Sequence, residues 1–439
     1  MALRPALADG LPAPIAEQDF RPFDPRRARL GQLLFYDKIL SGNRNISCAT
    51  CHAVEFATSD GLSLGIGEGG VGLGPDRTLE TGANRPLKRV PRNAPALFNL
   101  GHKSVRVMFH DGRLSDEEVY GTGFDSPIEE WLPGGLQSVL AAQALMPLTS
   151  KVEMAGSPEE NEVAAAINRR IDLAWPALVS RITAIPAYMD LFREAYPDVS
   201  QPADITPVHI ANALDDFQNS EYRAFDSPFD RYLVGDTSAL TAQELRGMDL
   251  FYGEAGCAGC HSGPLMTDQE FHAIALPPLG PGRTRRFDPY ARDVGRMGET
   301  DDLKDAYRFR TPSLRNVALT GPWGHNGAYG TLEGIVRHHL DPLGGLAAWR
   351  PEMAILPRDD GFAAIDLIAF EDRREMERLT RRVDIEPRAM PDADVDAILA
   401  FLGALTDCGS LTGRLGKPKT VPSGLPLDAT SAKIPDCDR

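Results

Sequence analysis

Two short cysteine motifs contain the residues whose types and spacing could do chemistry in this sequence. They read Cys48-Ala-Thr-Cys51-His52 and Cys257-Ala-Gly-Cys260-His261. Cys-x-x-Cys-His is the attachment motif of c-type haem, in which two thiols form thioethers and the histidine ligates the iron. Two Cys-x-x-Cys pairs could instead bind zinc or form thioredoxin-like redox pairs. Neither alternative requires a histidine after each second cysteine, so the motifs predict two covalent haems with His52 and His261 as iron ligands.

Two further cysteines, Cys408 and Cys437, complete the six in the chain. Covalent haem attachment takes place outside the cytoplasm, and an oxidising compartment would let these two thiols form a disulfide. Two unpaired thiols are the alternative. No signal-peptide pattern follows Met1, because Pro5 and Pro12 interrupt any apolar stretch. We therefore expect a periplasmic protein whose leader has been removed and whose C-terminal tail is pinned by this disulfide.

The charge balance argues against a nucleic-acid partner. The 439 residues include 46 Lys and Arg against 62 Asp and Glu, a formal net charge of −16, without a block of basic residues. Phosphate binding needs clustered cations, whereas an acidic surface favours a basic protein partner or simply solubility. No apolar run approaches the roughly 18 residues of a membrane span. The length and the 42% of hydrophobic residues are typical of a globular chain with two or three domains.

Helical patterns dominate the chain, and there is no sustained strand alternation. Thr206-Pro207 starts one helix, which carries an apolar stripe from Ile210 to Phe217. A capping box, Thr241-Ala-Gln-Glu244, opens a second helix that runs into the second haem motif. A third helix near the end of the chain carries an apolar stripe from Val395 to Leu402.

The two haem motifs lie in different halves of the chain, which therefore reads as a coarse duplication. Pro197, Pro202 and Pro207 cluster between the halves, as residues of a linker do. We predict two cytochrome-like domains, residues 1–200 and residues 201–439, with one haem in each.

A glycine-rich segment from Gly61 to Gly82 lies between the haem motifs. Within it, Gly65-Ile-Gly67-Glu-Gly69-Gly70 formally matches the G-x-G-x-x-G pattern of dinucleotide sites. No strand pattern precedes it and no clear helix pattern follows, so we interpret the segment as a loop.

Segments along most of the chain resemble, in order, those of the bacterial diheme cytochrome c peroxidases and the related MauG enzymes. They are Leu33–Asp37, Leu40–Asn43, Ser47–Cys48, Arg92–Pro95, Asp111–Arg113, Glu153–Met154, Thr311–Asn316, Thr320–Gly327, Ala400–Leu402 and Leu405–Thr406. The resemblance implies an all-α fold of two cytochrome c-like domains, each with one covalently bound c-type haem. It also implies a calcium ion between the haems, held by Asn93 and the carbonyls of Thr320 and Pro322, since oxygen donors suit a hard cation.

His339 is the expected sixth ligand of the second haem. In the family this ligand lies fourteen residues after the histidine that corresponds to His325. Independently, His339 falls on the apolar face of a helix from Leu332 to Leu340, and His338 projects about 100° away from that face. A histidine on such a face is usually a satisfied core residue, but here a haem is available to it. The peroxidases place methionine and MauG places tyrosine at this position; histidine would lower the potential relative to methionine.

The first haem is expected to have an open coordination position. Many diheme peroxidases block this iron with a histidine from the loop after the motif until the other haem is reduced. Here no histidine occurs between His52 and His102, and Glu68 in the glycine-rich segment is a poor iron ligand. The resemblance thus implies that this haem binds peroxide without prior reduction, unless His102 reaches the iron.

Peroxide cleavage needs a group that moves a proton from the inner to the outer oxygen, a task that suits a carboxylate. The family supplies a glutamate with a glutamine ten residues earlier, and these correspond to Glu153 and Gln143. Lys151 stands where the family has proline. Two solvated polar residues are the alternative interpretation.

Other departures concern the electron path and two insertions. His110 stands before Asp111, where the family usually has a tryptophan between the haems, and Trp323 is another aromatic that could serve. Residues 114–140 and 342–388 read as insertions, and the second could dock a partner protein.

These features predict a MauG-like enzyme, close in character to the methanobactin-associated enzyme MbnH. It would react with hydrogen peroxide at the first haem and oxidatively modify an aromatic residue of a partner protein, through a high-valent state shared by two haems. The second haem would transfer electrons. The alternative is a diheme cytochrome c peroxidase that reduces peroxide with electrons from a small c-type cytochrome or copper protein. An electron carrier with two six-coordinate irons is a third possibility, against which the open first haem argues.

Overall fold

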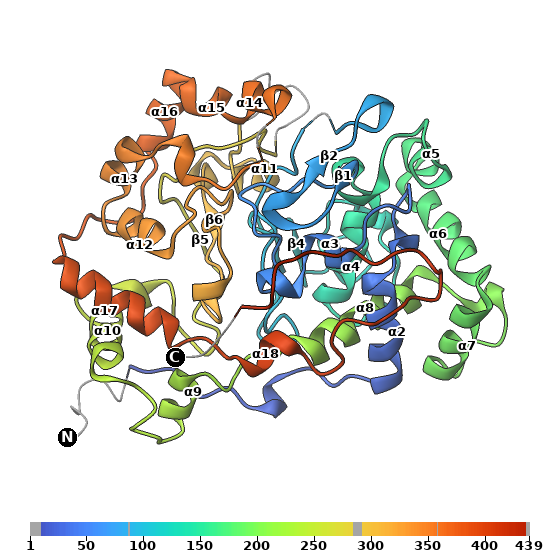
Figure 1. Ribbon diagram of the computed structural model, residues 1–439, viewed down its shortest axis with the longest axis horizontal. Coiled ribbons are helices and arrows are strands. Elements are labelled where there is room, and N and C mark those ends of the chain that lie inside the picture. The colour runs from blue at the N-terminus through green and yellow to red at the C-terminus, as the bar shows by residue number, and fades with distance from the viewer. Residues whose placement is uncertain (1–9, 87, 284–291, 358, 436–439) are drawn as a thin grey trace.

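The computed structural model describes residues 10–86, 88–283, 292–357 and 359–435. Within these residues the fold is mostly helical, as predicted. Figure 1 shows helices of the first half of the chain on the right and helices of the second half on the left. The strands form three short antiparallel pairs: β1 (Gly70–Val71) with β2 (Thr78–Leu79), β3 (Val107–Met108) with β4 (Leu114–Ser115), and β5 (Phe271–His272) with β6 (Phe309–Arg310).

The first half is organised around the crossing of two helices, α2 and α8. At this crossing a Cβ atom on Gly31 of α2 would lie 1.9 Å from the carbonyl oxygen of Ala213 and 2.9 Å from Cβ of Phe217. No side chain fits there, so Gly31 sets the distance between the helices. The α-helices of this half are α2 (Pro25–Tyr36), α3 (Cys48–Cys51), α4 (Val139–Thr149), α5 (Glu162–Arg169), α6 (Ala174–Thr183), α7 (Pro186–Ala195) and α8 (Pro207–Glu221).

The second half repeats this crossing with α10 and α17. A Cβ atom on Gly247 would lie 1.8 Å from the carbonyl oxygen of Ala397 and 2.8 Å from Cβ of Phe401. The same order of glycine, alanine and phenylalanine in both halves supports the predicted duplication. The α-helices of this half are α9 (Pro228–Leu233), α10 (Ala242–Tyr252), α11 (Met297–Thr300), α12 (Leu332–Leu340), α13 (Pro342–Ala348), α14 (Asp360–Asp366), α15 (Ile368–Glu371), α16 (Arg373–Thr380), α17 (Asp392–Gly403) and α18 (Gly409–Thr412).

The predicted helix starts are present, with one change of capping partner. At the start of α10, the N–H of Glu244 donates to Oγ1 of Thr241 (3.3 Å) and the N–H of Thr241 donates to Oε2 of Glu244 (2.7 Å). At the start of α8, the N–H of Thr206 donates to Nδ1 of His209 (3.0 Å). His209 therefore takes the part that glutamate plays in a capping box.

The hydrophobic packing changes from one core to the other after Ala224. The first core includes buried residues from Leu30 to Ala224, and thus the whole apolar face of α8. The C-terminal tail also returns to it, since Leu411 and Val421 are buried there and the dark red trace runs over the first half in Figure 1. The predicted domains, 1–200 and 201–439, stay a prediction; the buried residues of the first core continue past residue 200, to Ala224.

The tail is tied down by hydrogen bonds to the first half. Oγ of Ser423 donates to Oδ1 of Asp37 (2.6 Å), and the N–H of Gly416 donates to Oε1 of Glu221 (2.6 Å). Cys408 is disulfide-bonded. Cys437, its predicted partner, lies outside the described residues.

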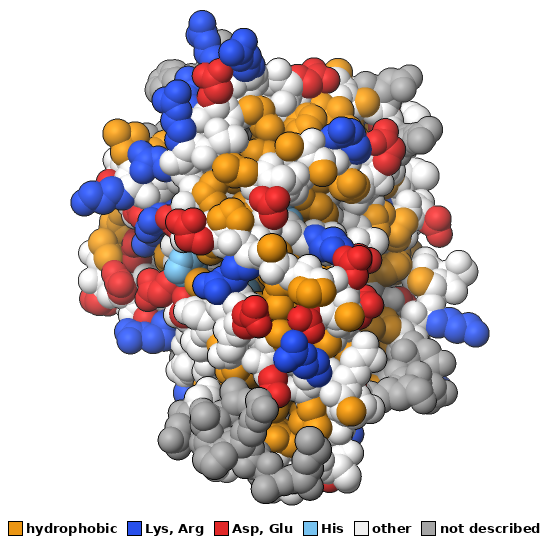
Figure 2. Space-filling model, turned by 90° about the vertical axis from the view of Figure 1, so that its left-hand side faces the viewer, with side chains coloured by type: hydrophobic (Ala, Val, Ile, Leu, Met, Phe, Trp, Pro, Cys, Tyr) orange, Lys and Arg blue, Asp and Glu red, His pale blue; other side chains and the backbone are white. Residues whose placement is uncertain are grey.

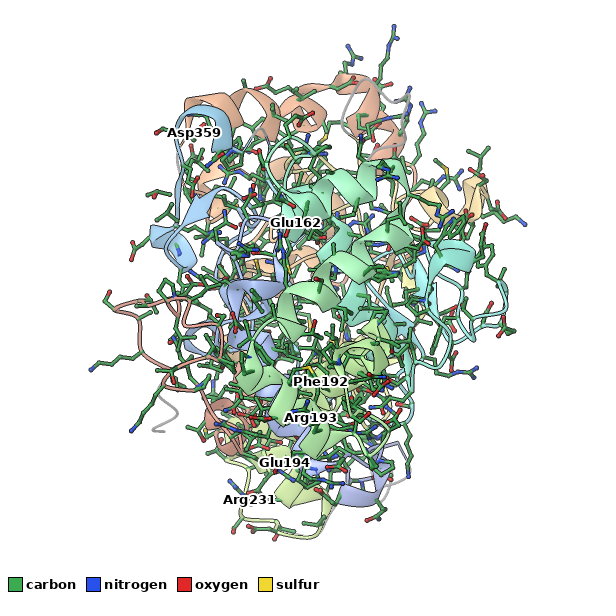
Figure 3. All side chains as sticks on the ribbon, turned by 90° about the vertical axis from the view of Figure 1, so that its right-hand side faces the viewer. Glu162, Phe192, Arg193, Glu194, Arg231 and Asp359 are labelled. Carbon is green, nitrogen blue, oxygen red and sulfur yellow. The ribbon has the colours of Figure 1, made fainter. Side chains whose placement is uncertain are left out.

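A layer formed by α5, α6 and α7 closes the side of the first half shown in Figure 3. Phe192 of α7 is buried in the core. Arg181 of α6 donates through Nε to Oε1 of Glu162 on α5 (2.6 Å) and through its two terminal nitrogens to the carbonyls of Ser41 and Gly42 (2.7 and 2.8 Å). The layer therefore holds the segment that leads into the first haem motif.

The insertion at residues 342–388 joins the two halves. Arg89 of the first half donates through Nε to Asp366 on α14 (3.0 Å), and both side chains are buried. At the surface, a terminal guanidinium nitrogen of Arg85 donates to Oδ1 of Asp359 (2.6 Å). The sequence suggested a partner-docking element, and the structure adds this internal role.

The face of the second half in Figure 2 carries acidic and basic side chains interspersed with apolar ones. Among the described residues, no helix combines the length and the apolarity that crossing a bilayer requires.

Replacing Arg89 with alanine should destabilise the protein strongly. The substitution leaves the carboxylate of Asp366 buried without its partner, and losing one member of a buried pair costs about 3–5 kcal/mol. Arg373→Ala is the matched control, because Arg373 makes an exposed pair with Glu377 at 3.1 Å, worth below about 1 kcal/mol. Urea unfolding of the haem-loaded variants, followed by circular dichroism, measures both effects. Equal shifts of the urea midpoint in the two variants would contradict a stabilising role for the Arg89–Asp366 pair.

Candidate active site

The first cysteine motif forms a single helical turn, α3, that ends at His52. Nδ1 of His52 lies 3.0 Å from the carbonyl oxygen of Thr58. A carbonyl can only accept, so Nδ1 carries the hydrogen and Nε2 is left as a bare ligand atom. Burial lowers the pKa of His52, which keeps the ring neutral and able to ligate a metal.

The second motif is arranged in the same way around His261. Its first three residues, Cys257–Gly259, form a 3₁₀ turn, and Nδ1 of His261 lies 3.3 Å from the carbonyl oxygen of Met266. Burial lowers the pKa of His261 to about 4, so this ring is neutral as well. None of the four cysteines of the two motifs is in a disulfide, so all four are available to attach a haem.

His339 faces His261 across a gap of the size that one metal ion requires. The two ring centroids are 6.2 Å apart. A metal–imidazole bond is about 2 Å long, so two imidazoles on opposite sides of one ion have their centres about 6 Å apart. Nδ1 of His339 lies 2.8 Å from the carbonyl oxygen of Ile335, which again leaves Nε2 as the free ligand atom. His338 is turned away and lies 2.8 Å from the hydroxyl of Tyr329.

A cavity of about 590 Å³ surrounds this pair of histidines. Its wall includes both cysteines of the second motif and the apolar face of α12, from Leu332 to Leu340, that the sequence predicted. The residues present fit a covalent haem: Cys257 and Cys260 would attach it, and His261 and His339 would ligate its iron.

Arg310 supports this fit, and the sequence did not single it out. It lines the cavity, and its guanidinium donates to the carbonyls of Phe109 (3.0 Å) and Thr311 (3.3 Å). Within the described residues it forms no ion pair with a carboxylate, and burial lowers its pKa to about 10. A buried cation needs a counter-ion, and a haem propionate would supply one. In the sequence, only its position directly before the family-like segment Thr311-Pro312-Ser313 could have indicated a role for Arg310.

The cysteines do not converge as a zinc site would require. In the part of the chain that the structure describes, the one cluster of possible metal ligands that includes a cysteine contains Cys260, Asp268 and His272. It contains no other cysteine, and the two motifs lie in different halves of the fold. A zinc ion held by two Cys-x-x-Cys pairs is therefore incompatible with this arrangement.

The residues expected to bind calcium all line the same cavity. They are Asn93, Thr320 and Pro322. Nδ2 of Asn93 donates to the carbonyl of Leu62 (2.8 Å), which fixes the amide and directs Oδ1 to the opposite side. Their role as calcium ligands stays a prediction.

The position that tryptophan takes in the family is filled by a hydrogen-bonded imidazole. Nε2 of His110 donates to the carbonyl of Asn93 (3.1 Å), and the carbonyl of His110 accepts from the N–H of Arg310 (2.7 Å). Nearby, His325 stacks flat on Phe309, with 3.5 Å between ring centroids and 7° between planes. The region is thus aromatic and rigid although the tryptophan is missing.

Glu153 lies on a π-helical turn, Lys151–Ala155, directly after α4. π-turns inside helical segments occur frequently at functional sites. Burial raises the pKa of the Cys51 thiol to about 12, and the charges of Asp60 and Glu153 act in the same direction. Glu153 therefore lies within electrostatic reach of the first motif. Gln143 is half-buried on α4, and its partnership with Glu153 stays a prediction.

Two residues that could have blocked the first iron make contacts elsewhere. Glu68 is buried, and its Oε1 accepts from Nδ2 of Asn43 (2.7 Å) and of Asn45 (2.6 Å). The ring of His102 packs edge-on against Phe20, with centroids 5.6 Å apart. These contacts favour an open coordination position at the first haem.

The sequence comparisons agree with this arrangement. The family described as Di-haem cytochrome c peroxidase matches residues 25–238. Methylamine utilization protein MauG of Methylorubrum extorquens is 33% identical over 332 residues, which cover 75% of this chain and 72% of that protein. The chain belongs to the di-haem cytochrome c peroxidase and MauG family. It is therefore a haem enzyme that uses hydrogen peroxide and carries two c-type haems, as predicted.

Relatives within this family include both of its kinds. The cytochrome c551 peroxidase of Pseudomonas aeruginosa is 28% identical over 334 residues, covering 75% of this chain and 76% of that protein. The crystal structure of a MauG-like protein associated with microbial copper homeostasis superposes with a TM-score of 0.58 at 28% identity, covering 93% and 97% of the two chains. The crystal structure of the diheme peroxidase BthA from Burkholderia thailandensis superposes with a TM-score of 0.57 at 26% identity, covering 93% of this chain and 91% of that one.

Replacing His339 with alanine should convert the second haem from low spin to high spin, because the iron loses its sixth ligand. His338→Gln is the control, since His338 faces Tyr329 and should leave the spin state unchanged. Electron paramagnetic resonance of the oxidised proteins measures both. His339→Met should keep the low-spin state and raise the reduction potential. A low-spin second haem in the alanine variant would exclude His339 as the ligand.

Proposed function

We propose that this family member is a MauG-like enzyme that reacts with hydrogen peroxide and oxidatively modifies an aromatic residue of a partner protein. The observation that carries the proposal is the contrast between the two haem sites. His339 is aimed at the second site, whereas the loop after the first motif contains no histidine and its Glu68 is bound to Asn43 and Asn45. An iron that is open in the resting state needs no prior reduction before it meets peroxide.

Each proposed role belongs to residues at identified positions. Cys48, Cys51, Cys257 and Cys260 attach the haems, and His52, His261 and His339 ligate the irons. Bound haems would supply the redox chemistry and hold the two oxidising equivalents of peroxide. Glu153, near the first motif, would take a proton from the inner peroxide oxygen and return it to the outer one, with Gln143 as its proposed partner.

A conventional cytochrome c peroxidase is the second candidate, and a specific observation favours it. The cytochrome c551 peroxidase is nearly as similar to the chain as MauG, at 28% against 33% identity. In that case the partner would be an electron donor, a small c-type cytochrome or copper protein. In either case we propose that the protein is periplasmic and that its partner is a protein, not a nucleic acid.

Peroxide titration without a reductant should distinguish the two candidates. We expect a high-spin signal from the first haem and a low-spin bis-histidine signal from the second in the fully oxidised protein. One equivalent of peroxide should abolish both signals together, because the equivalents are shared. Electron paramagnetic resonance measures this. A low-spin first haem that ignores peroxide until the second haem is reduced would identify a conventional peroxidase.

Substitution of Asn93 should abolish calcium binding. We propose that Asn93 and the carbonyls of Thr320 and Pro322 hold one calcium ion, so Asn93→Ala should lose it. Thr320→Val is the matched control, because the proposed ligand there is the backbone carbonyl and the hydroxyl only contacts Val317 (3.4 Å). Elemental analysis after gel filtration gives the metal content per chain. Wild-type protein without calcium, or an alanine variant that retains it, would refute the site.

A further inference from the structure

The glycine-rich segment after the first motif is held in place by a buried arginine. Arg77 is 3% exposed. Its guanidinium donates to three carbonyls of the same segment, those of Ile66 (2.6 Å), Gly67 (2.8 Å) and Gly72 (2.5 Å). All three guanidinium nitrogens are therefore used on the loop itself, and the arginine closes it into a compact unit.

The loop is also fixed to the chain on either side of the first haem site. Glu68 accepts from Asn43 and Asn45, which precede the motif by a few residues. The N–H of Glu68 donates to the carbonyl of Val152 (3.3 Å), in the π-turn that carries Glu153. The loop thus bridges the approach to the first motif and the turn with the proposed acid–base residue.

Gly67 makes the closest contact between the loop and this turn. A Cβ atom on Gly67 would lie 2.1 Å from the carbonyl oxygen of Val152 and 2.9 Å from Cα of Glu153. The backbone of Gly67 does not have a positive φ, so another residue could adopt its conformation. Glycine is needed at this position only because a side chain would clash, and its backbone packs against the backbone of Val152 and Glu153.

We propose that Arg77 and Gly67 are positioning residues for Glu153. The arginine holds the loop rigid, and the loop backbone, through Gly67, sets the place of the glutamate at the first haem. This inference rests on the proposed acid–base role of Glu153. Displacing a catalytic group by about 1 Å can cost roughly a hundredfold in rate, so a support of this kind is expected to be visible in kinetics.

Gly67→Ala tests the contact with a single added methyl group. The methyl must push the turn away, and we expect the peroxide reaction of the first haem, followed by stopped-flow absorption, to slow by about tenfold to a hundredfold. Gly134→Ala is the control, because Gly134, like Gly67, does not have a positive φ, and nothing lies within 4 Å of the added atom. It should react at the wild-type rate.

A double-mutant cycle distinguishes positioning from general damage. Glu153→Gln alone should slow the reaction by about 10²- to 10⁴-fold. If Gly67 acts through Glu153, Gly67→Ala should add nothing in the Glu153→Gln background. Arg77→Lys, which cannot reach three carbonyls, should reproduce the Gly67→Ala effect and its dependence on Glu153.

Haem content and the low-spin signal of the second haem should be unchanged in every variant, which confirms folding. A Gly67→Ala rate equal to that of the Gly134→Ala control, or a full effect that persists without the Glu153 carboxylate, would overturn the positioning role. A wild-type rate in Glu153→Gln would instead refute the proposed acid–base function, and with it the inference.

Discussion

The site depends on one repeated interaction, a hydrogen bond from Nδ1 of an imidazole to a backbone carbonyl. It occurs three times, from His52 to Thr58, from His261 to Met266 and from His339 to Ile335. The bond fixes the tautomer and the plane of the ring, and it leaves Nε2 facing the space for the haem. For this to work the carbonyls must be stationary. The carbonyl of Ile335 belongs to the helix that carries His339, and that of Thr58 lies in the turn that follows the first motif.

The stationary framework is the pair of glycine crossings. Gly31 and Gly247 let a helix of each half approach its partner to backbone contact. At such a crossing the glycine meets a backbone carbonyl and a Cβ atom, which no change of rotamer can move, so the helices cannot slide without a clash. The two halves therefore have the same kind of helix crossing, and the chemical difference between their haem sites must come from other segments. In the second half it arises from α12, which presents His339. In the first half it arises from a loop without a histidine.

Much of this arrangement was predictable because it depends on local patterns. The haem motifs, the capping box at Thr241 and the apolar face that carries His339 all lie within one turn or one helix. What the sequence could not indicate are contacts between distant segments. The ties of Arg89 to Asp366 and the return of the C-terminal tail pair residues that no periodicity connects. The capping role of His209 was missed for another reason, because histidine is not among the residues that mark a helix start.

The open position proposed at the first haem requires more than the absence of a histidine ligand. A glycine-rich loop is costly to order, because glycine loses more conformational freedom than any other residue. Without hydrogen bonds to hold it, the loop that carries Glu68 would have many accessible conformations. The three bonds of Arg77 and the two from Asn43 and Asn45 offset that entropy with side chains that do no chemistry themselves. The loop sequence supplies close approach through glycine, and the buried arginine supplies rigidity. The proposed open iron and the proposed acid–base role of Glu153 would therefore both depend on the same set of contacts.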